Sequence, residues 1–384
     1  MTASPRTILV VLGTRPEAIK LAPVVLEMRR RGGPLAPRIL ATGQHRDLLA
    51  GALETFGLVA DANLELMVDG QSLSVLAGRA LIALDGFLAE SRPDVVLVQG
   101  DTTTTMCGAL AAFHRDIAVG HVEAGLRTGD IRSPFPEELN RRIATTVTRH
   151  HFAPTARARD ALRHEGIDDA RIVVTGNTGI DALFAALARP CPLDGALGEL
   201  RASGAPFAVV TLHRRESFGP DLEAVCTGVR RLLDRVPELR VVVPLHPNPR
   251  VREAIPRILG DHPRAHLVQP MDYLPFAHLL AAARFVVTDS GGIQEECPSL
   301  GKPVMVVRRV TERPEAVEAG SARLIGPDPH ALVALGERLV TDGPDYAAMA
   351  TPRPVYGDGH AAGRIVDYLE RQLGVVAPVA GGAS

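Results

Sequence analysis

The sequence predicts an α/β protein built from two Rossmann-like domains, each with a doubly wound parallel sheet. Two observations lead to this prediction. Short runs rich in valine, isoleucine and leucine recur along the chain, and segments with a helical pattern separate them. The chain also has 384 residues, whereas a single domain usually holds about 100–200. Two successive βαβ series therefore fit the sequence better than one large core.

The strand candidates are apolar throughout rather than alternating, which is typical of parallel strands covered by helices on both faces. In the first half they begin at Ile8, Arg38, Val95, Ile117, His150 and Arg171. In the second half they begin at Phe207, Arg240, Ala265, Phe285 and Pro303, with a weaker run at Ala322. Proline and glycine accumulate in the stretch 188–206. The predicted domains are therefore residues 1–180 and 181–360, and residues 378–384 are expected to form a disordered tail.

Composition restricts the class of protein. The formal net charge of −2 creates no global attraction to nucleic acid or anionic membranes, and no apolar run approaches the ~20 residues of a membrane span. The four cysteines form no CxxC pair and no signal peptide is evident, so we expect a cytoplasmic protein. Walker A, GxGxxG and HExxH patterns are missing, which argues against P-loop, NAD and zinc chemistry. We expect neither a cofactor nor a metal.

Polar side chains gather just after the predicted strands. These positions are Gly13–Arg15, Gln44–Arg46, Asp101, Glu123, His213, His246 and Ser290–Gly292. Ligands bind at the carboxyl ends of the strands in open parallel sheets, so we expect two such edges to face each other across one cleft. The alternative is that strand ends merely favour turn residues and helix caps. That alternative explains threonine and glycine well, but the acids and histidines poorly.

Two segments have the features of anion sites. In GTRPEAIK, Pro16 suits a first helical turn, and Arg15 and Lys20 add cations to a helix N-terminus. A solvated basic first turn is the alternative, although cations oppose the helix dipole there. In TDSGGIQEECPSLGKPV, Ser290 and two glycines open a helix whose bare amides can approach a phosphate. Either Glu295 or Glu296 is then placed to reach a ribose.

The acidic candidates lie in three further motifs. Asp101, in GDTTTT, either points into the cleft or caps the next helix. Glu123, in GHVEAGLRTGD, ends a strand, where a lone carboxylate needs a partner. In SPFPEELNRR, Glu137 and Glu138 are adjacent, about 100° apart around a helix, so only one can face a given site. We expect the other, Glu138, to be a surface residue.

His213 ends the first predicted strand of the second domain, in TLHRRESFG. A lone histidine at a strand end is more often structural. Here the neighbouring charged side chains, Arg214, Arg215 and Glu216, favour a polar pocket. Arg313, before a proline-opened helix in TERPEAVEAG, repeats the pattern of a cation at a helix start.

Twelve sequence blocks occur in one order between about Ile8 and Tyr368. They are GTRPEAIK, TGQHRDLL, QGDTTTT, GHVEAGLRTGD, SPFPEELNRR, TGNTGIDAL, HRRESFG, PLHPNPRVR, DYLPF, TDSGGIQEECPSLGKP, TERPEA and YGDG. No single block is decisive, but all twelve in order are very specific. Together they resemble the non-hydrolysing UDP-N-acetylglucosamine (UDP-GlcNAc) 2-epimerase family.

This resemblance implies a glycosyltransferase-B type fold and a homodimer. A last helix, at about 361–377, would cross back to the first domain. The implied reaction interconverts UDP-GlcNAc and UDP-N-acetylmannosamine (UDP-ManNAc) by eliminating UDP to 2-acetamidoglucal and adding it back. Three alternatives stay open: a hydrolysing epimerase, a glycosyltransferase of the same fold and a non-enzymatic sugar-nucleotide sensor.

The resemblance also assigns roles to individual residues. Those implied to act on the sugar are Asp101, Glu123, Glu137 and His213. Those implied to hold UDP are Arg15, Lys20, His213, Met271, Phe276, Ser290, Gly291, Gly292, Glu296 and Arg313. A second, regulatory UDP-GlcNAc is implied at Gln44, His45, Arg46, Arg214 and His246. The chain departs from the family at Met271, where many members carry glutamine near the uracil, and at Arg308–Val310, where some carry an acidic residue.

Overall fold

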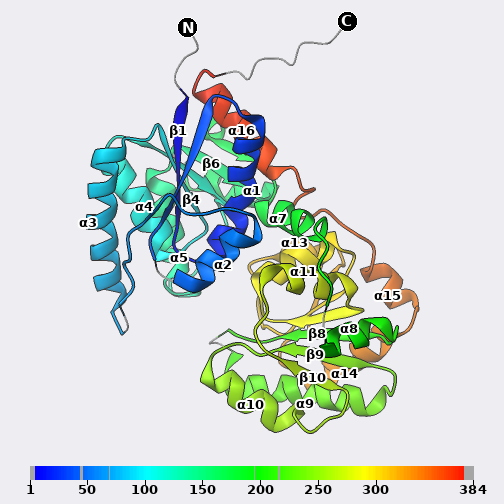
Figure 1. The fold of residues 1–384 in the computed structure, drawn as a ribbon. Helices are drawn as coiled ribbons and strands as arrows, with labels where there is room; N and C mark the ends of the chain where they lie inside the picture. Colours follow the sequence, from blue (N-terminus) through cyan, green and yellow to red (C-terminus); the bar gives the residue numbers. More distant parts are fainter. Residues whose placement is uncertain (1–4, 44–45, 69, 194, 215–216, 376–384) are drawn as a thin grey trace, which may run out of the picture. The chain divides into compact units, whose positions relative to one another are not determined.

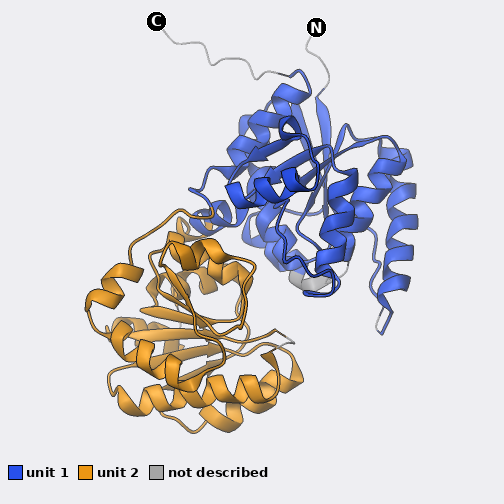
Figure 2. Ribbon diagram, turned by 180° about the vertical axis from the view of Figure 1, so that it is seen from behind, with its two compact units in different colours: residues 1–185, 357–384 blue, residues 186–356 orange. Residues whose placement is uncertain are grey.

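The computed structural model describes residues 5–43, 46–68, 70–193, 195–214 and 217–375. The chain divides into two compact units, drawn in blue and orange in Figure 2. Unit 1 comprises residues 1–185 and 357–384, and unit 2 comprises residues 186–356. Each unit contains one parallel sheet flanked by helices (Figure 1), so the predicted fold of two doubly wound, Rossmann-like domains is confirmed.

The sheet of unit 1 has seven strands in the described part of the chain, in the order β3-β2-β1-β4-β5-β6-β7. They are β1 (Arg6–Leu12), β2 (Leu35–Ala41), β3 (Ala62–Asn63), β4 (Val95–Gln99), β5 (Ala118–Val122), β6 (His150–Ala153) and β7 (Ile172–Val174). All pairs are parallel. The six predicted strands are present; β3 was not predicted, because two residues are too few for a hydrophobic pattern.

The helices of unit 1 cover both faces of this sheet. They are α1 (Arg15–Arg31), α2 (Arg46–Thr55), α3 (Leu73–Ser91), α4 (Thr103–His114), α5 (Glu137–Val147), α6 (Ala156–His164), α7 (Thr178–Leu187) and α16 (Ala361–Gln372), with a 3-10 turn at Asp169–Arg171. Buried side chains of α3, α4 and α5 pack on Leu9, Val11 and Val98 of the strands. Figure 1 shows α1 and α16 on the opposite side of β1.

The last helix, α16, is anchored to unit 1 at both ends. The Asp181 carboxylate accepts hydrogen bonds from the amides of Ala361 (3.2 Å) and Ala362 (2.8 Å) at the start of α16. Near the other end, the Tyr368 hydroxyl lies 3.1 Å from His150 Nδ1 on β6. The chain therefore leaves unit 1 after residue 185 and returns to it at residue 357.

The sheet of unit 2 has the order β10-β9-β8-β11-β12-β13. Its strands are β8 (Phe207–Thr211), β9 (Arg240–Pro244), β10 (Ala265–Val268), β11 (Phe285–Thr288), β12 (Val304–Val306) and β13 (Ala322–Leu324). The helices are α8 (Gly195–Ala202), α9 (Pro220–Arg235), α10 (Pro249–Leu259), α11 (Tyr273–Ala282), α12 (Gly291–Ser299), α13 (Pro314–Glu318), α14 (Pro329–Val340) and α15 (Pro344–Met349). Helices α9, α10 and α14 build one buried core, with α11 and α13 across the sheet (Figure 1).

Both sheets reverse their strand order at one point. In unit 1 the reversal lies between β1 and β4, and in unit 2 it lies between β8 and β11. Such topological switch points open a crevice beyond the carboxyl ends of the two strands, where doubly wound proteins bind ligands. Among the helices that the structure describes, none combines the length and the apolar character of a membrane span.

Candidate active site

The switch point of unit 1 is tied together by a buried carboxylate, Glu17. Its Oε2 accepts hydrogen bonds from the amides of Gly13 (2.8 Å) and Thr14 (2.6 Å), directly after β1. Its Oε1 accepts hydrogen bonds from the hydroxyls of Thr102 (2.6 Å) and Thr105 (3.1 Å), which follow β4. Burial raises the pKa of Glu17, although these hydrogen bonds oppose the rise. One side chain therefore fixes both loops of the switch point.

Sequence reasoning missed Glu17 as a site-building residue. The available signal was its position three residues after Thr14, which is the spacing of a capping box. Gly13 belongs to the same structure, since a Cβ atom there would lie 2.2 Å from Thr104 Oγ1. Arg15 is the first residue of α1 and is partly buried, at the helix entrance where it was predicted.

Glu123 directly follows β5 and lies beside a cation. Lys20 Nζ donates a hydrogen bond to Glu123 Oε2, and Asn177 Nδ2 donates another at 3.2 Å. The backbone of Glu123 is left-handed, with φ +66°, a conformation that non-glycine residues adopt at a cost of about 1–3 kcal/mol and that is common at functional sites. Glu123 was expected to need a partner, and that partner is Lys20. The family resemblance assigns Lys20 to the binding of UDP.

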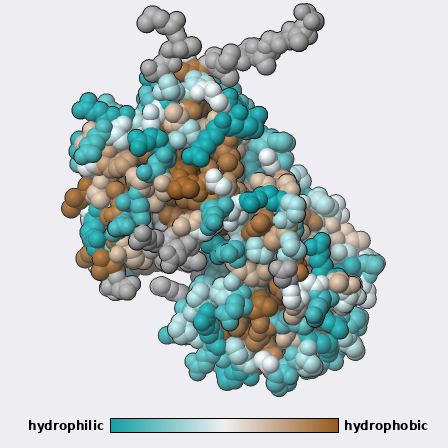
Figure 3. Space-filling view, in the orientation of Figure 1, coloured by the Kyte–Doolittle hydropathy of each residue, from teal (hydrophilic) through white to brown (hydrophobic). Residues whose placement is uncertain are grey.

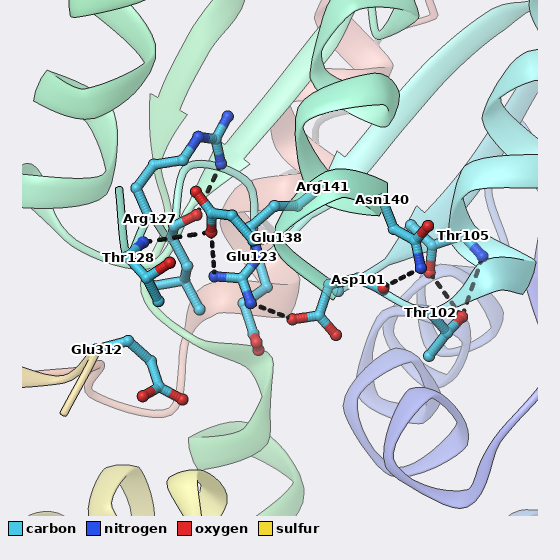
Figure 4. Close-up of polar contacts among 12 residues, drawn as sticks. Asp101, Thr102, Thr105, Glu123, Arg127, Thr128, Glu138, Asn140, Arg141 and Glu312 are labelled. Carbon is cyan, nitrogen blue, oxygen red and sulfur yellow. Dashed lines mark hydrogen bonds and ion pairs between the residues drawn. The ribbon is translucent and has the colours of Figure 1, made fainter. Parts of the chain in front are cut away.

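Asp101, two residues after β4, does not cap α4. The cap is Thr102, whose hydroxyl accepts the amide of Thr105 at 3.1 Å. The Asp101 carboxylate instead accepts a hydrogen bond from Arg141 Nη2 at 2.6 Å (Figure 4). Of the two interpretations of Asp101 from the sequence, the helix cap is therefore excluded.

The expectation that Glu138 is a surface residue is wrong. Its side chain is fully buried and accepts hydrogen bonds from the Thr128 amide (3.2 Å) and Arg142 Nε (3.2 Å). Its Oε2 also lies 3.4 Å from Arg141 Nη1. The helical spacing separated the two glutamates correctly, but it did not show which face of α5 is buried. Glu137, in the first turn of α5, is partly exposed, and its role stays a prediction.

The switch point of unit 2 is organised by Asp289, which follows β11 and is fully buried. Its carboxylate accepts hydrogen bonds from the amides of His213 (3.0 Å) and Arg214 (3.0 Å), just after β8. The His213 and His246 rings stack with centroids 5.5 Å apart. Burial lowers the pKa of His213, although Asp289 counteracts this effect. Sequence reasoning missed Asp289, which stands between Thr288 and Ser290 in the predicted phosphate motif.

Helix α12 begins beneath a guanidinium group. A Cβ atom on Gly291 would lie 2.5 Å from Arg313 Cζ, so any larger residue there would displace this guanidinium group. Arg313 Nε donates to Glu295 (2.6 Å) and its Nη1 donates to Glu312 (2.6 Å). The adjacent Glu296 accepts a hydrogen bond from the Tyr273 hydroxyl at 3.0 Å. The two neighbouring glutamates therefore have different partners, and Arg313 is held at the N-terminus of α12.

Glu312 is the centre of a cluster of cations. Besides Arg313, it contacts Arg308 Nη1 at 2.7 Å and Arg214 Nη2 at 3.3 Å. Burial opposes ionisation of this carboxyl, but the three guanidinium groups hold its pKa far below its ordinary value. The family resemblance assigns Arg214 to a regulatory UDP-GlcNAc and Arg313 to UDP. Both arginines therefore belong to the same network.

The remaining candidates are less informative. Met271 precedes α11 and Phe276 lies in its first turns, and both are partly buried. Gln44 and His45 lie outside the described residues, as does the side chain of Arg46. Within the described ranges, no three side chains of His, Cys, Asp or Glu are grouped to hold a metal ion.

Comparison with known proteins gives the family of the chain. The profile of the UDP-N-acetylglucosamine 2-epimerase family matches residues 27–370. The enzyme of that name from Escherichia coli K12 is 46% identical over 371 residues, which cover 94% of this chain and 98% of the relative. The Bacillus subtilis 168 enzyme is 44% identical over 364 residues, covering 94% of each chain.

Solved structures give the same result. UDP-GlcNAc 2-epimerase from Neisseria meningitidis, bound to UDP-GlcNAc, superimposes with a TM-score of 0.89, 40% identity and coverage of 95% and 100% of the two chains. The Methanocaldococcus jannaschii enzyme, in complex with UDP-GlcNAc and UDP, superimposes with a TM-score of 0.81 and 30% identity. The match covers 95% of this chain and 99% of that one. A glycosyltransferase shares only the fold, at 16% identity and a TM-score of 0.65. The chain belongs to the UDP-N-acetylglucosamine 2-epimerase family.

Proposed function

We propose that this protein interconverts UDP-GlcNAc and UDP-ManNAc without hydrolysing them. The observation that carries the proposal is a pair of carboxylates after the neighbouring strands β4 and β5, each held by a cation. Asp101 is paired with Arg141, and Glu123 is paired with Lys20. Family membership and the ligands named for relatives, UDP-GlcNAc and UDP, support the choice of substrate.

The chemistry explains why several carboxylates are useful. The hydrogen on C2 of the sugar is not beside a carbonyl, so simple deprotonation is very unfavourable. Breaking the C1–O bond first, or at the same time, sends the electron pair to UDP and leaves positive charge at C1. Removal of the C2 proton then gives 2-acetamidoglucal. UDP adds back at C1 while a proton arrives on the other face of C2.

Each group of candidate residues has a part in this scheme. Asp101, Glu123 and Glu137 offset the charge at C1 and move protons. Positive groups and backbone amides stabilise the departing diphosphate. They come from Arg15, Lys20, Arg313 and the turn Ser290–Gly292. His213 contacts phosphate or carries a proton, Glu296 binds the ribose, and Met271 and Phe276 lie by the uracil. The sugar keeps its oxidation state, so the reaction needs no redox cofactor.

Two properties of the assembly belong to the same proposal. A second UDP-GlcNAc acts as an activator through Gln44, His45, Arg46, Arg214 and His246. The protein forms a homodimer, supported by apolar side chains that are exposed on α3 and α4, namely Leu73, Val75, Ile82 and Phe113. Figure 3 shows apolar atoms on the α3 side of unit 1.

Product analysis tests the proposal. Purified protein is incubated with UDP-GlcNAc, without added metal or NAD, and the products are identified by NMR. UDP-ManNAc in equilibrium with UDP-GlcNAc is expected. Free ManNAc with UDP would indicate a hydrolysing enzyme, turnover only with an acceptor would indicate a transferase, and binding without turnover would indicate a sensor.

A further inference from the structure

One side of helix α5 supports the loop that carries Asp101. Asn140 Nδ2 donates a hydrogen bond to the Asp101 carbonyl oxygen at 2.9 Å, and Arg141 Nη2 donates to the Asp101 carboxylate at 2.6 Å. The Asp101 side chain is 31% exposed, whereas that of Arg141 is only 5% exposed. A buried arginine therefore fixes a carboxylate that is partly exposed to solvent, and Figure 4 shows the contact between the two.

Arg141 is in turn held from behind by Glu138. The fully buried Glu138 places Oε2 3.4 Å from Arg141 Nη1 and is fixed by the Thr128 amide. Among the described residues, Arg141 Nε and Nη1 have no hydrogen-bond partner. The position of the guanidinium is thus set by two carboxylates, Glu138 on the buried side and Asp101 on the exposed side.

The buried charges of this arrangement cost folding free energy, which indicates that they are kept for function. Burying Glu138 and Arg141 requires desolvation that ion pairing repays only in part, and removing one of them leaves an uncompensated charge. An arginine side chain also keeps its proton at all accessible pH values. Arg141 consequently cannot carry the C2 proton itself, and its contribution is limited to geometry and fixed charge.

We propose that Arg141 is a positioning residue that holds the Asp101 carboxylate in one orientation for its work on the sugar ring, with Glu138 as its buried support. The inference rests on the proposed epimerase function and deepens it. A carboxylate anchored through Oδ2 cannot rotate freely about its side-chain bonds. Misplacement by about 1 Å can cost an enzyme on the order of 100-fold in rate, so losing this anchor affects turnover far more than binding.

The test compares kcat and KM for five variants in the same assay as the wild-type protein. Arg141→Met is expected to lower kcat by at least about tenfold with KM nearly unchanged, and Arg141→Lys to restore part of the loss. In an Asp101→Asn background, Arg141→Met is expected to cost little more, because residues that act as a unit are not additive. Arg142→Met is the matched control, since Arg142 also contacts Glu138 but is 40% exposed.

Glu138→Gln combined with Arg141→Met removes both buried charges, and it replaces the single variant if Arg141→Met alone does not fold. Wild-type kcat in either variant would contradict the inference, as would an equal loss in the presence and absence of Asp101. A loss in Arg142→Met as large as in Arg141→Met would point to a general effect on α5 and also contradict it. A wild-type protein without epimerase activity would instead contradict the proposed function on which the inference rests.

Discussion

The two switch points share a topology but hold different chemistry. In unit 1 the reversal between β1 and β4 presents carboxylates, Asp101 and, beside it after β5, Glu123, each paired with a buried or half-buried cation. In unit 2 the reversal between β8 and β11 presents a glycine-opened helix beneath Arg313, and His213 held by Asp289. The fold supplies a switch point in each unit, and the side chains at the strand ends decide which chemical groups that switch point suits.

The largest expected effect separates the chemistry of the unit 1 carboxylates from the binding of UDP. Asp101→Asn and Glu123→Gln should each lower kcat by at least ~100-fold, the usual scale for a positioned acid or base. UDP affinity, measured by isothermal titration calorimetry, should change little, because both substitutions keep every cation proposed to hold UDP, including Lys20 beside Glu123. A strong loss of UDP binding in both variants would contradict this division of roles.

A second comparison concerns two glycines of unit 2. Gly291→Ala places a Cβ atom 2.5 Å from Arg313 Cζ, whereas nothing lies within 4 Å of a Cβ atom on Gly292. We expect Gly291→Ala to lower both the melting temperature and UDP affinity, the latter by roughly tenfold, or about 1.4 kcal/mol. Gly292→Ala should lower UDP affinity alone. Equal melting temperatures for the two variants would show that the contact with Arg313 does not matter.

The adjacent glutamates of α5 provide a third, smaller contrast. Glu138→Gln should cost about 1–3 kcal/mol of stability, because a buried acceptor of charged hydrogen bonds is lost. It should also lower kcat through Arg141. Glu137→Gln, at a partly exposed position, should lower kcat with little change in stability. Thermal unfolding and steady-state kinetics on both variants test this assignment, and the reverse pattern would contradict it.

A fourth effect is the acid sensitivity of unit 1. Burial lowers the pKa of His121 and His150 to about 4 and that of His151 to about 3. These side chains stay neutral in the folded protein but gain protons in the unfolded chain below about pH 6.5. The free energy of unfolding should therefore fall as pH drops from about 6.5 towards 4, by up to about 1.4 kcal/mol per pH unit for each histidine.

His150→Phe removes one of these groups. In melts recorded between pH 7 and pH 5, its melting temperature should fall less steeply than that of the wild-type protein. Slopes that are identical for the two proteins would show that His150 does not contribute.

The sequence predicted the position of candidate residues that lie next to a strand with a clear apolar pattern. Asp101, Glu123 and His213 lie within two residues of the ends of strands whose apolar pattern is strong, so their place at the sheet edges could be predicted. Their partners could not, because they come from distant positions: Lys20 is 103 residues from Glu123 and Arg141 is 40 residues from Asp101. Only the folded topology brings such residues together.

The errors have the same origin. Glu138 was expected at the surface because helical periodicity gives angular separation without showing which face is covered. The sequence left open whether Asp101 caps α4, because aspartate is a good N-cap; the loop geometry gives the cap to Thr102 instead. Asp289 and Glu17 were overlooked because buried carboxylates that accept backbone amides have no distinctive pattern in the sequence.

The central claim is that the C2 proton leaves and returns while UDP is detached from C1. Running the reaction in D₂O and following C2 by NMR tests it most directly. We predict that both the UDP-ManNAc formed and the UDP-GlcNAc recovered at equilibrium carry deuterium at C2, with the C1–O bond broken and remade in each turnover. UDP-ManNAc that forms without deuterium at C2 would contradict the account.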